Sequence, residues 1–122
     1  EEAAPSLFKN YRPDHKAAEF MTITYEMQEG LKDKIPAVVH VDNTARPQVV
    51  RKDVNASYHK IIAEFGKHSG IDVVLNTSFN IHEEPIVYTP DDAIRGFLGA
   101  QLDYLAMGPF LVKLPDSFGS RA

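Results

Sequence analysis

The sequence predicts an α/β (α+β) protein in which a mixed twisted sheet is covered by flanking helices. Two kinds of pattern predict this class. Apolar and polar residues alternate along residues 21–27, which is typical of a half-buried strand, and two later segments place apolar residues at helical spacing. Between them lie short apolar runs bounded by Gly, Pro, Asn or Asp. A chain that alternates such strands and helices is expected to build one layered core.

The strand-like segments come in a definite order. In the first, Met21, Ile23, Tyr25 and Met27 share one face. Further strands are expected at residues 37–41, 46–50 and 71–75, and a last one is interrupted at Gly108-Pro109, giving segments 104–107 and 110–114. Asp42-Asn43 predicts a turn, because Asn tolerates the left-handed backbone of tight turns.

Two helices are expected. The first begins after Asn55, whose side chain can cap free N–H groups, and ends by Gly70, a favoured left-handed C-cap. Its apolar stripe comprises Tyr58, Ile61, Ile62 and Phe65. The second has Thr89 as N-cap and Pro90 at its first position, with acidic residues in the first turn. Its inward stripe comprises Ile94, Phe97, Leu98 and Leu102.

Length and composition narrow the class of protein. The 122 residues suit a single domain, or a fragment of a larger one, with a loose tail at 115–122; the start at Glu1 without Met suggests a piece of a longer protein. Without cysteine, disulfides and thiol chemistry are excluded. The net charge of −4, with both signs interspersed, gives no footprint for nucleic acid. No long apolar run or signal peptide is present, so we expect a cytoplasmic protein without membrane contact.

A cluster of short polar side chains follows the strand at 71–75. Asn76, Thr77, Ser78 and Asn80 can offer hydroxyl, carboxamide and backbone N–H groups to an anion or another polar ligand. Ligands gather where strands end in open α/β sheets. The same residues are also common turn formers, and on chemistry alone an ordinary turn is favoured.

The longer stretch of sequence around this polar cluster resembles a known family. Asn76-Thr77-Ser78-Phe79-Asn80, followed by residues 84–87 and 89–93, is similar to the C-terminal region of the O-carbamoyltransferases of antibiotic and nodulation-factor biosynthesis. A second block upstream, His40-Val41-Asp42 with Thr44-Ala45-Arg46 and Gln48, resembles the same family. Two blocks in the right order, within residues 20–112, are more specific than one short motif.

The resemblance implies a fold and an activity. The C-terminal half of these enzymes is similar to the YrdC fold of threonylcarbamoyl-adenylate synthases, so this chain is expected to be part of a YrdC-like domain. In the family this domain makes carbamoyl adenylate from carbamoyl phosphate and ATP, which is bound with Mg²⁺ as a substrate. The product passes to an N-terminal actin-like domain that holds iron and the acceptor hydroxyl. Those two substrates and that domain are the implied partners.

The resemblance also assigns site residues. Arg46 is expected to be catalytic and to bind phosphate, since its planar fork grips two oxygens. Ser78 is expected to be catalytic as a binding hydroxyl rather than a nucleophile, and Ser78 and Asn80 form the serine-x-asparagine pair used around the nucleotide phosphates and metal. Asn76 would support the carbamoyl group. The family's lysine- and arginine-containing phosphate site is expected just upstream of Glu1, so isolated residues 1–122 are expected to be inactive.

One departure from the family pattern and two alternatives accompany this assignment. Many family members have Gly-Glu-Pro where this chain has Glu83-Glu84-Pro85, so Glu83 stands where glycine would permit positive φ, and a different loop path is expected. The His and carboxylate residues at 40, 42 and 82–84 lack the spacing of a metal site, so we expect no metal bound by protein ligands alone. The alternative function is a non-catalytic module of the same fold that binds a nucleotide or a partner.

Overall fold

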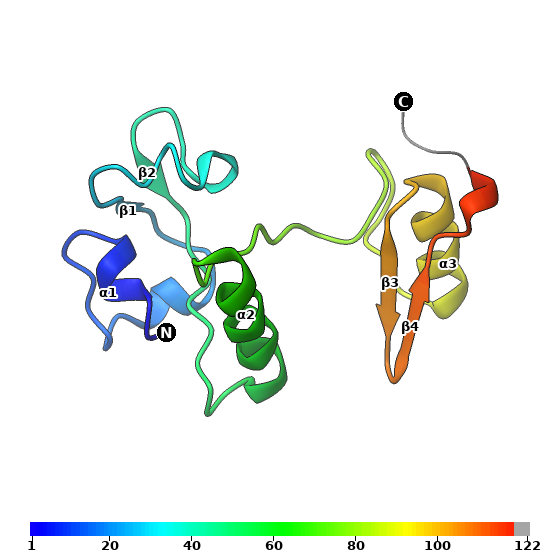
Figure 1. Cartoon of the computed structure of the whole chain (residues 1–122), viewed down its shortest axis with the longest axis horizontal. Helices are drawn as coiled ribbons and strands as arrows, with labels where there is room; N and C mark the ends of the chain where they lie inside the picture. The colour runs from blue at the N-terminus through cyan, green and yellow to red at the C-terminus, as the bar shows by residue number, and fades with distance from the viewer. Residues whose placement is uncertain (119–122) are drawn as a thin grey trace. The chain divides into compact units, whose positions relative to one another are not determined.

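The chain is described over residues 1–118 by a computed structural model, which divides into two compact units (Figure 1). The N-terminal unit spans Glu1–Leu75, and the C-terminal unit begins at Asn76. Each contains helices and a two-stranded antiparallel sheet, which confirms the α+β class. In the expected tail, η3 spans Asp116–Phe118, and residues 119–122 lie outside the described part of the chain.

The N-terminal unit is built from short elements around one apolar core. Along the chain these are α1 (Ala4–Leu7), η1 (Lys16–Glu19), β1 (Tyr25–Glu26), η2 (Pro36–Val38), β2 (Thr44–Ala45) and α2 (Ala56–Ser69). The buried core comprises Ala4, Leu7, Phe8, Ala18, Met27, Ala45 and Val49. Ala45 and Val49 therefore fix both ends of the segment that carries Arg46.

The ribbon formed by β1 and β2 confirms one predicted strand in part. The alternation at 21–27 is seen in burial, because Met27 is 1% exposed while the intervening Thr and Glu residues are exposed. Only Tyr25–Glu26 pairs as a strand, with Tyr25 opposite Ala45. Met21 has a φ of 55°, in the left-handed region, so the regular strand cannot extend back to it.

Three other predicted strands are wrong. Residues 37–41 begin with η2, where Val38 N–H donates to the Ile35 carbonyl (3.2 Å), so the backbone bonds locally. Residues 46–50 bury Val49 and Val50 without pairing. Residues 71–75 pair with no strand among the described residues. Apolar β-branched runs suit strands, but a strand also needs a partner, and propensity cannot supply one.

The predicted helix after Asn55 is confirmed at both ends. The Asn55 side chain accepts a hydrogen bond from Tyr58 N–H (3.1 Å), and Gly70 closes α2 with a φ of 81°. The expected inward stripe is not buried in this unit: Ile61 is 62% exposed and Phe65 is 45% exposed. The caps are local and act without tertiary partners, whereas burial of the stripe needs a packing surface.

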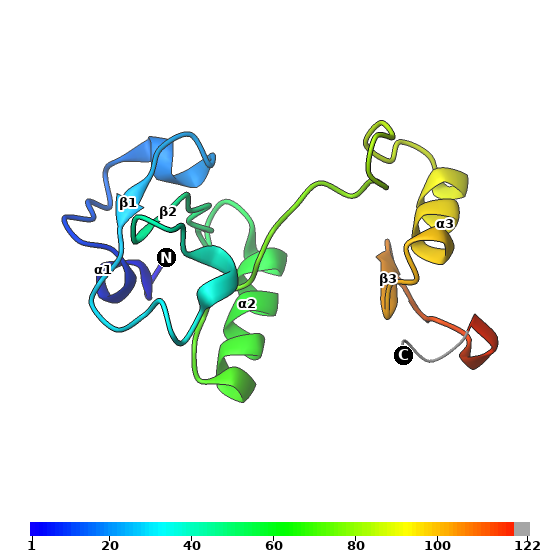
Figure 2. The same ribbon diagram turned by 90° about the horizontal axis from the view of Figure 1, so that it is seen from above.

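The C-terminal unit packs one helix on one hairpin. It contains α3 (Pro90–Gly99), β3 (Tyr104–Met107) and β4 (Phe110–Lys113), and α3 lies beside the hairpin (Figures 1 and 2). Thr89 forms the predicted N-cap within a capping box, in which its side chain accepts from Asp92 N–H and the Asp92 carboxylate accepts from Thr89 N–H. Ala93, Phe97 and Leu105 form the buried core.

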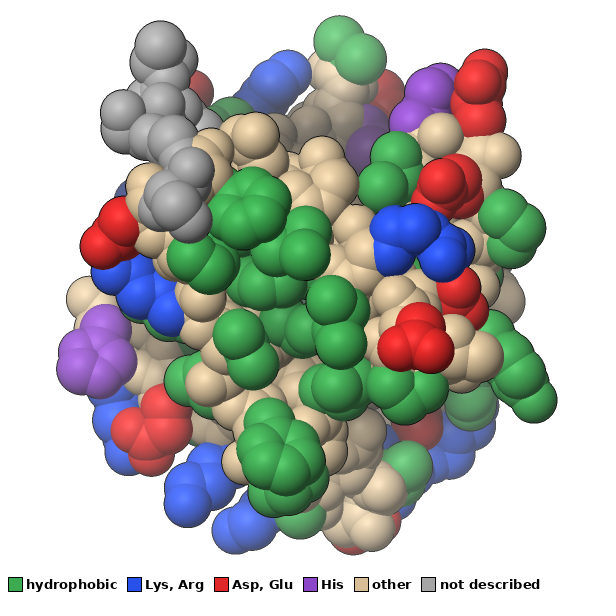
Figure 3. Space-filling view, turned by 90° about the vertical axis from the view of Figure 1, so that its right-hand side faces the viewer, with side chains coloured by type: hydrophobic (Ala, Val, Ile, Leu, Met, Phe, Trp, Pro, Cys, Tyr) green, Lys and Arg blue, Asp and Glu red, His purple; other side chains and the backbone are tan. Residues whose placement is uncertain are grey.

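The predicted interruption at Gly108-Pro109 is confirmed, but its two sides form the antiparallel strands of a hairpin rather than one interrupted strand. Gly108, with a φ of 57°, turns the chain so that Met107 pairs with Phe110 and Leu105 with Val112. β4 is exposed along its whole length. Figure 3 shows hydrophobic side chains gathered on the surface of this unit, where the exposed residues include Ile86, Tyr88, Tyr104, Phe110 and Leu111.

Candidate functional site

A closed loop over residues 78–87 carries two of the predicted site residues. Ser78 Oγ donates a hydrogen bond to Asn80 Oδ1 (2.5 Å), so the serine-x-asparagine pair is brought together. Asn80 Nδ2 donates to the carbonyls of Ile81 (3.1 Å) and Glu84 (3.0 Å). With its proton directed at Asn80, the exposed Ser78 oxygen presents its lone pairs to solvent.

Apolar neighbours hold this loop on α3. Phe79 O accepts from Val87 N–H (2.9 Å), which closes the loop at its base. Phe79 and Val87 both pack against the core of the unit, and a Cβ on Gly96 would lie 3.5 Å from the Phe79 ring. Because Phe79 turns inward, its two neighbours Ser78 and Asn80 are directed away from the core. Ser78 is exposed, whereas Asn80 is half-buried and its amide is bonded to the loop backbone.

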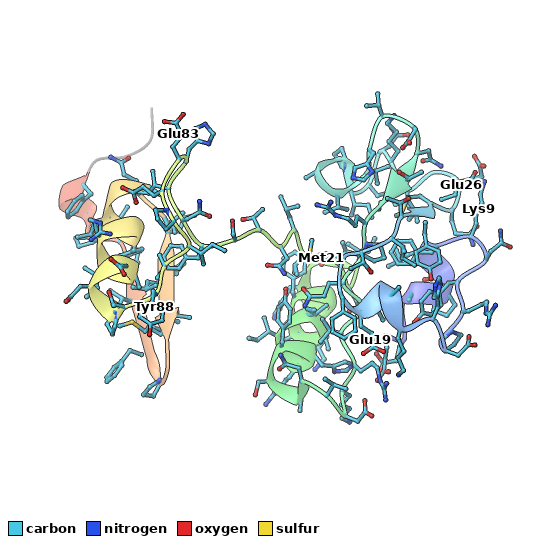
Figure 4. All side chains as sticks on the ribbon, turned by 180° about the vertical axis from the view of Figure 1, so that it is seen from behind. Lys9, Glu19, Met21, Glu26, Glu83 and Tyr88 are labelled. Atoms are coloured by element: carbon cyan, nitrogen blue, oxygen red, sulfur yellow. The ribbon has the colours of Figure 1, made fainter. Side chains whose placement is uncertain are left out.

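Glu83 lies at the tip of the same loop (Figure 4). Its φ is 68°, within a turn closed by a bond from Glu84 N–H to Ile81 O (2.9 Å). This is the left-handed conformation that glycine adopts most readily. Glu83 thus adopts the positive φ that glycine would permit and bears its steric cost. The expectation of a loop path different from that of the family stays a prediction.

The other two predicted residues lie elsewhere in the chain. Asn76 is exposed at the beginning of the C-terminal unit, two residues before Ser78. Arg46 belongs to the N-terminal unit, directly after β2. The guanidinium is exposed and makes no hydrogen bond or ion pair with the residues that the structure describes. Its donors are therefore available to a ligand, as the predicted phosphate contact requires.

The turn predicted at Asp42-Asn43, before Arg46, carries side-chain hydrogen bonds that were not foreseen from the sequence. Thr44 Oγ1 donates to Asp42 Oδ1 (2.8 Å) and contacts His40 Nδ1 (2.9 Å). The Asp42 carboxylate also accepts from Thr44 N–H (3.1 Å), while His40 N–H donates to Thr44 O (2.7 Å). The bond from the Thr44 hydroxyl, with that from its N–H, holds the pKa of Asp42 below its usual value. Asp-x-Thr is the local signal for such a turn.

One group of side chains within residues 1–118 brings three metal-ligating atoms within 4.8 Å of one another, namely Glu1, Glu2 and His59. The His59 ring lies 2.9 Å from the Glu2 carboxylate, and this hydrogen bond is the main cause that lowers the pKa of Glu2 to about 2. The geometry is that of a hydrogen bond between a histidine ring and a carboxylate. It contains none of the residues at 40, 42 or 82–84.

A cleft of about 420 Å³ lies in the N-terminal unit, lined by Tyr11, His15, Lys16, Glu19 and Arg51 among others. Its cations are already paired: Glu19 lies 3.1 Å from Lys16 Nζ and 3.5 Å from Arg51 Nη1. The Glu19 side chain is only 14% exposed and contacts both cations, and Arg51 is also paired with Asp53. This cleft does not include Arg46.

Comparison with known proteins decides the family. Residues 1–114 match the family described as carbamoyltransferase C-terminus. The chain belongs to this family. The match includes the turn at 40–44, Arg46 and the loop at 78–87, and it confirms the resemblance found in the sequence.

Named relatives cover much of the chain. The nodulation protein NolO of Bradyrhizobium diazoefficiens is 43% identical over 94 residues, which are 77% of this chain and 17% of the relative. NolNO of Sinorhizobium fredii is 42% identical over 94 residues, or 77% of this chain and 14% of the relative. An uncharacterized Methanocaldococcus jannaschii protein is 41% identical over 114 residues, 90% of this chain and 22% of that protein. The chain thus spans about a fifth or less of the relatives it matches.

None of the helices in residues 1–118 is both long enough and apolar enough to cross a membrane.

Proposed function

We propose that the full-length protein is a carbamoyltransferase, and that this chain contributes to forming carbamoyl adenylate from carbamoyl phosphate and ATP for transfer to a hydroxyl acceptor. The observation that carries the proposal is the match of residues 1–114 to the carbamoyltransferase C-terminus family. Both proposed substrates are polyanions. The residues that bind them must therefore place positive charge and hydrogen-bond donors around phosphate oxygens.

Arg46 is proposed to bind phosphate and to act in catalysis. Attack on the α-phosphate of ATP adds negative charge to its oxygens, and a guanidinium can bind two of them through parallel hydrogen bonds. Arg46 suits this task because it is exposed, while Ala45 beside it is 6% exposed and anchors the backbone in the core. A residue before proline also favours an extended backbone, which directs the side chain outward from the ribbon.

Ser78, Asn80 and Asn76 are proposed to bind the phosphates, the accompanying Mg²⁺ and the carbamoyl group. Mg²⁺ prefers oxygen ligands, and the free lone pairs of Ser78 Oγ suit an ion that arrives with ATP. Asn80 holds the Ser78 hydroxyl and is itself held by two backbone carbonyls. Asn76 is proposed to support the carbamoyl group. Any iron and the acceptor are proposed to bind an N-terminal actin-like domain rather than these residues.

The proposal is tested with the full-length protein, carbamoyl phosphate and Mg-ATP. Mass spectrometry should detect carbamoyl adenylate. Each molecule formed should be accompanied by one pyrophosphate from ATP and by one inorganic phosphate, which water releases from carbamoyl phosphate to give the carbamate that attacks the α-phosphate. If the protein binds ATP with micromolar to millimolar affinity and yet forms no adenylate, the chain is part of a nucleotide-binding module and the enzymatic proposal is wrong.

A further inference from the structure

The turn that precedes Arg46 fixes the proton on one histidine. The Thr44 hydroxyl has a single proton, and Asp42, whose pKa is lowered, is an ionised acceptor. That proton therefore points to Asp42 Oδ1 (2.8 Å). The Thr44 oxygen must then accept from His40, so His40 Nδ1 carries a proton (2.9 Å). The neutral ring leaves its lone pair on Nε2, on the side of the exposed His40 ring that faces away from Thr44.

The alternation of buried and less buried residues around β2, which ends at Ala45, favours a common face for His40 and Arg46. Side chains two residues apart in an extended strand point the same way, so Thr44 and Arg46 share a face, while the buried Ala45 between them points to the core. His40 is hydrogen-bonded to the Thr44 side chain and to Thr44 O (2.7 Å). The ring is consequently held next to the strand that leads into Arg46.

The charges on and around this face are of both signs. Glu26 is directly opposite Thr44 in the ribbon, so its side chain is on the same face. Its carboxylate is bound to Lys9 Nζ at 2.6 Å, and Figure 4 shows the two side chains together. Asp42 is engaged by Thr44, and Lys32 Nζ donates to Val41 O within the turn (3.1 Å). Glu26 thus shares Lys9 with Glu29. The Asp42 carboxylate is hydrogen-bonded by Thr44 without a cation among the described residues, whereas the Arg46 guanidinium is exposed.

We propose that His40 binds a phosphate group of the substrate together with Arg46, through Nε2–H of the imidazolium, and that Thr44 and Asp42 are positioning residues that hold its ring. The neutral ring would present a lone pair to the anion, whereas the protonated ring presents a donor and a positive charge. This inference rests on the proposed function of Arg46. It adds to it a second phosphate ligand and a pH dependence of binding.

The orientation of the ring can be tested without any ligand. In ¹⁵N NMR of the full-length protein above pH 7.5, His40 should be the Nδ1–H tautomer, which is the less common form of free histidine. Thr44→Val keeps the shape of the side chain and removes the hydroxyl, so it should abolish this preference. An Nε2–H tautomer in the unmodified protein would overturn the proposed positioning.

Binding separates the His40 proposal from the assignment of Arg46. Calorimetric titrations with Mg-ATP, and separately with carbamoyl phosphate, are made at pH 6 and pH 8 on the unmodified protein and on His40→Gln, Arg46→Ala and His68→Gln. His68 is an exposed histidine of α2 and serves as the matched control. Loss of one charge-assisted hydrogen bond should weaken binding about tenfold in His40→Gln at pH 6. At pH 8, where most histidines are neutral, the difference should be small.

The two arms identify the phosphate concerned. If His40→Gln binds only Mg-ATP or only carbamoyl phosphate more weakly, His40 is assigned to that substrate. Each of these two results supports the proposal. If Arg46→Ala binds both substrates more weakly while His40→Gln binds both like the unmodified protein at pH 6, the His40 proposal is wrong and the assignment of Arg46 stands. If Arg46→Ala also binds both like the unmodified protein, the assignment of Arg46 is wrong as well.

Discussion

Ser78 Oγ is hydrogen-bonded to Asn80 Oδ1 (2.5 Å), and the same Asn80 side chain donates to Glu84 O (3.0 Å). The hydroxyl of one side of the loop is thereby tied to the backbone of the other side. Asn80 supports the loop and orients Ser78 at once, whereas Ser78 contributes no bond that closes the loop. Substitution of Ser78 consequently tests function more cleanly than substitution of Asn80.

Ser78→Ala should lower carbamoyl adenylate formation by about 100-fold or more, the scale for removing a preorganised group that stabilises developing charge. The loop should keep its structure because both hydrogen bonds that Asn80 Nδ2 donates to backbone carbonyls remain. Ser57→Ala, in the exposed first turn of α2, is the control and should be fully active. If the Ser78→Ala enzyme forms carbamoyl adenylate at a near-normal rate, Ser78 is not part of the functional site.

Glu83→Gly should stabilise the loop by up to about 1 kcal/mol, because glycine adopts positive φ without a Cβ clash. Slower hydrogen exchange at the amides of Glu84 and Val87 would report it. Activity should be preserved, and substrate affinity should improve if the Glu83 charge opposes the anions. Glu83→Ala removes the charge but keeps a Cβ, so a gain in affinity shared by both variants is due to charge. A large loss of activity in both would instead make Glu83 a functional ligand.

Two glycines in helices should respond oppositely to alanine. At Gly96 a Cβ would meet Phe79 at 3.5 Å and Val87 at 3.7 Å, which are ordinary contacts, so Gly96→Ala should stabilise α3 by about 1 kcal/mol. At Gly66 a Cβ would collide with the Asp72 carboxylate and approach Asp72 Cα to 3.3 Å, so Gly66→Ala should give no gain or a loss. Hydrogen exchange of the amides in residues 56–69 and 90–99 measures the effect of each substitution on its own helix. A loss of α3 stability in Gly96→Ala would contradict the ordinary contacts expected between the new Cβ and Phe79 and Val87.

Asp92 makes the stability of α3 dependent on acid pH. Its pKa is lowered to about 2 by hydrogen bonds from the Thr89 hydroxyl and backbone N–H, and then by Arg95. Because the folded value lies below the value of about 3.9 for an unfolded Asp, the stabilisation is complete above pH 4 and is lost as the pH falls toward 2. NMR titration of the Asp92 carboxyl should give a midpoint near 2. A midpoint near 3.9 would show that the capping box does not form.

Features set by local chemistry could be predicted from the sequence. The caps at Asn55, Gly70 and Thr89 were predicted residue by residue, as was the turn at Asp42-Asn43, where Asn43 has a φ of 63°. Each depends on a side chain and a backbone within a few residues of each other. The turn at Gly108 also depends only on residues close to it in the sequence.

Features that need a distant partner could not be predicted. Residues 37–41 and 71–75 have the composition of strands, yet neither is paired among the described residues. The resemblance singled out Ser78 and Asn80 as ligand-binding residues, but it did not predict their hydrogen bond. That bond, like the bonds joining His40, Asp42 and Thr44, depends on the rotation of the side chains. Sequence spacing does not contain that information. The roles of Arg46, Asn76, Ser78 and Asn80 stay predictions.

The central claim is most directly tested by the rate of carbamoyl adenylate formation in the full-length protein carrying Arg46→Ala. Arg12→Ala is the matched control, because Arg12 is exposed and its guanidinium binds Asp14 (2.7 Å) at the surface. The account predicts that Arg46→Ala forms adenylate at least about 100-fold more slowly with little change in thermal stability, while Arg12→Ala keeps the normal rate. Equal rates in the two variants and the unmodified protein would contradict it.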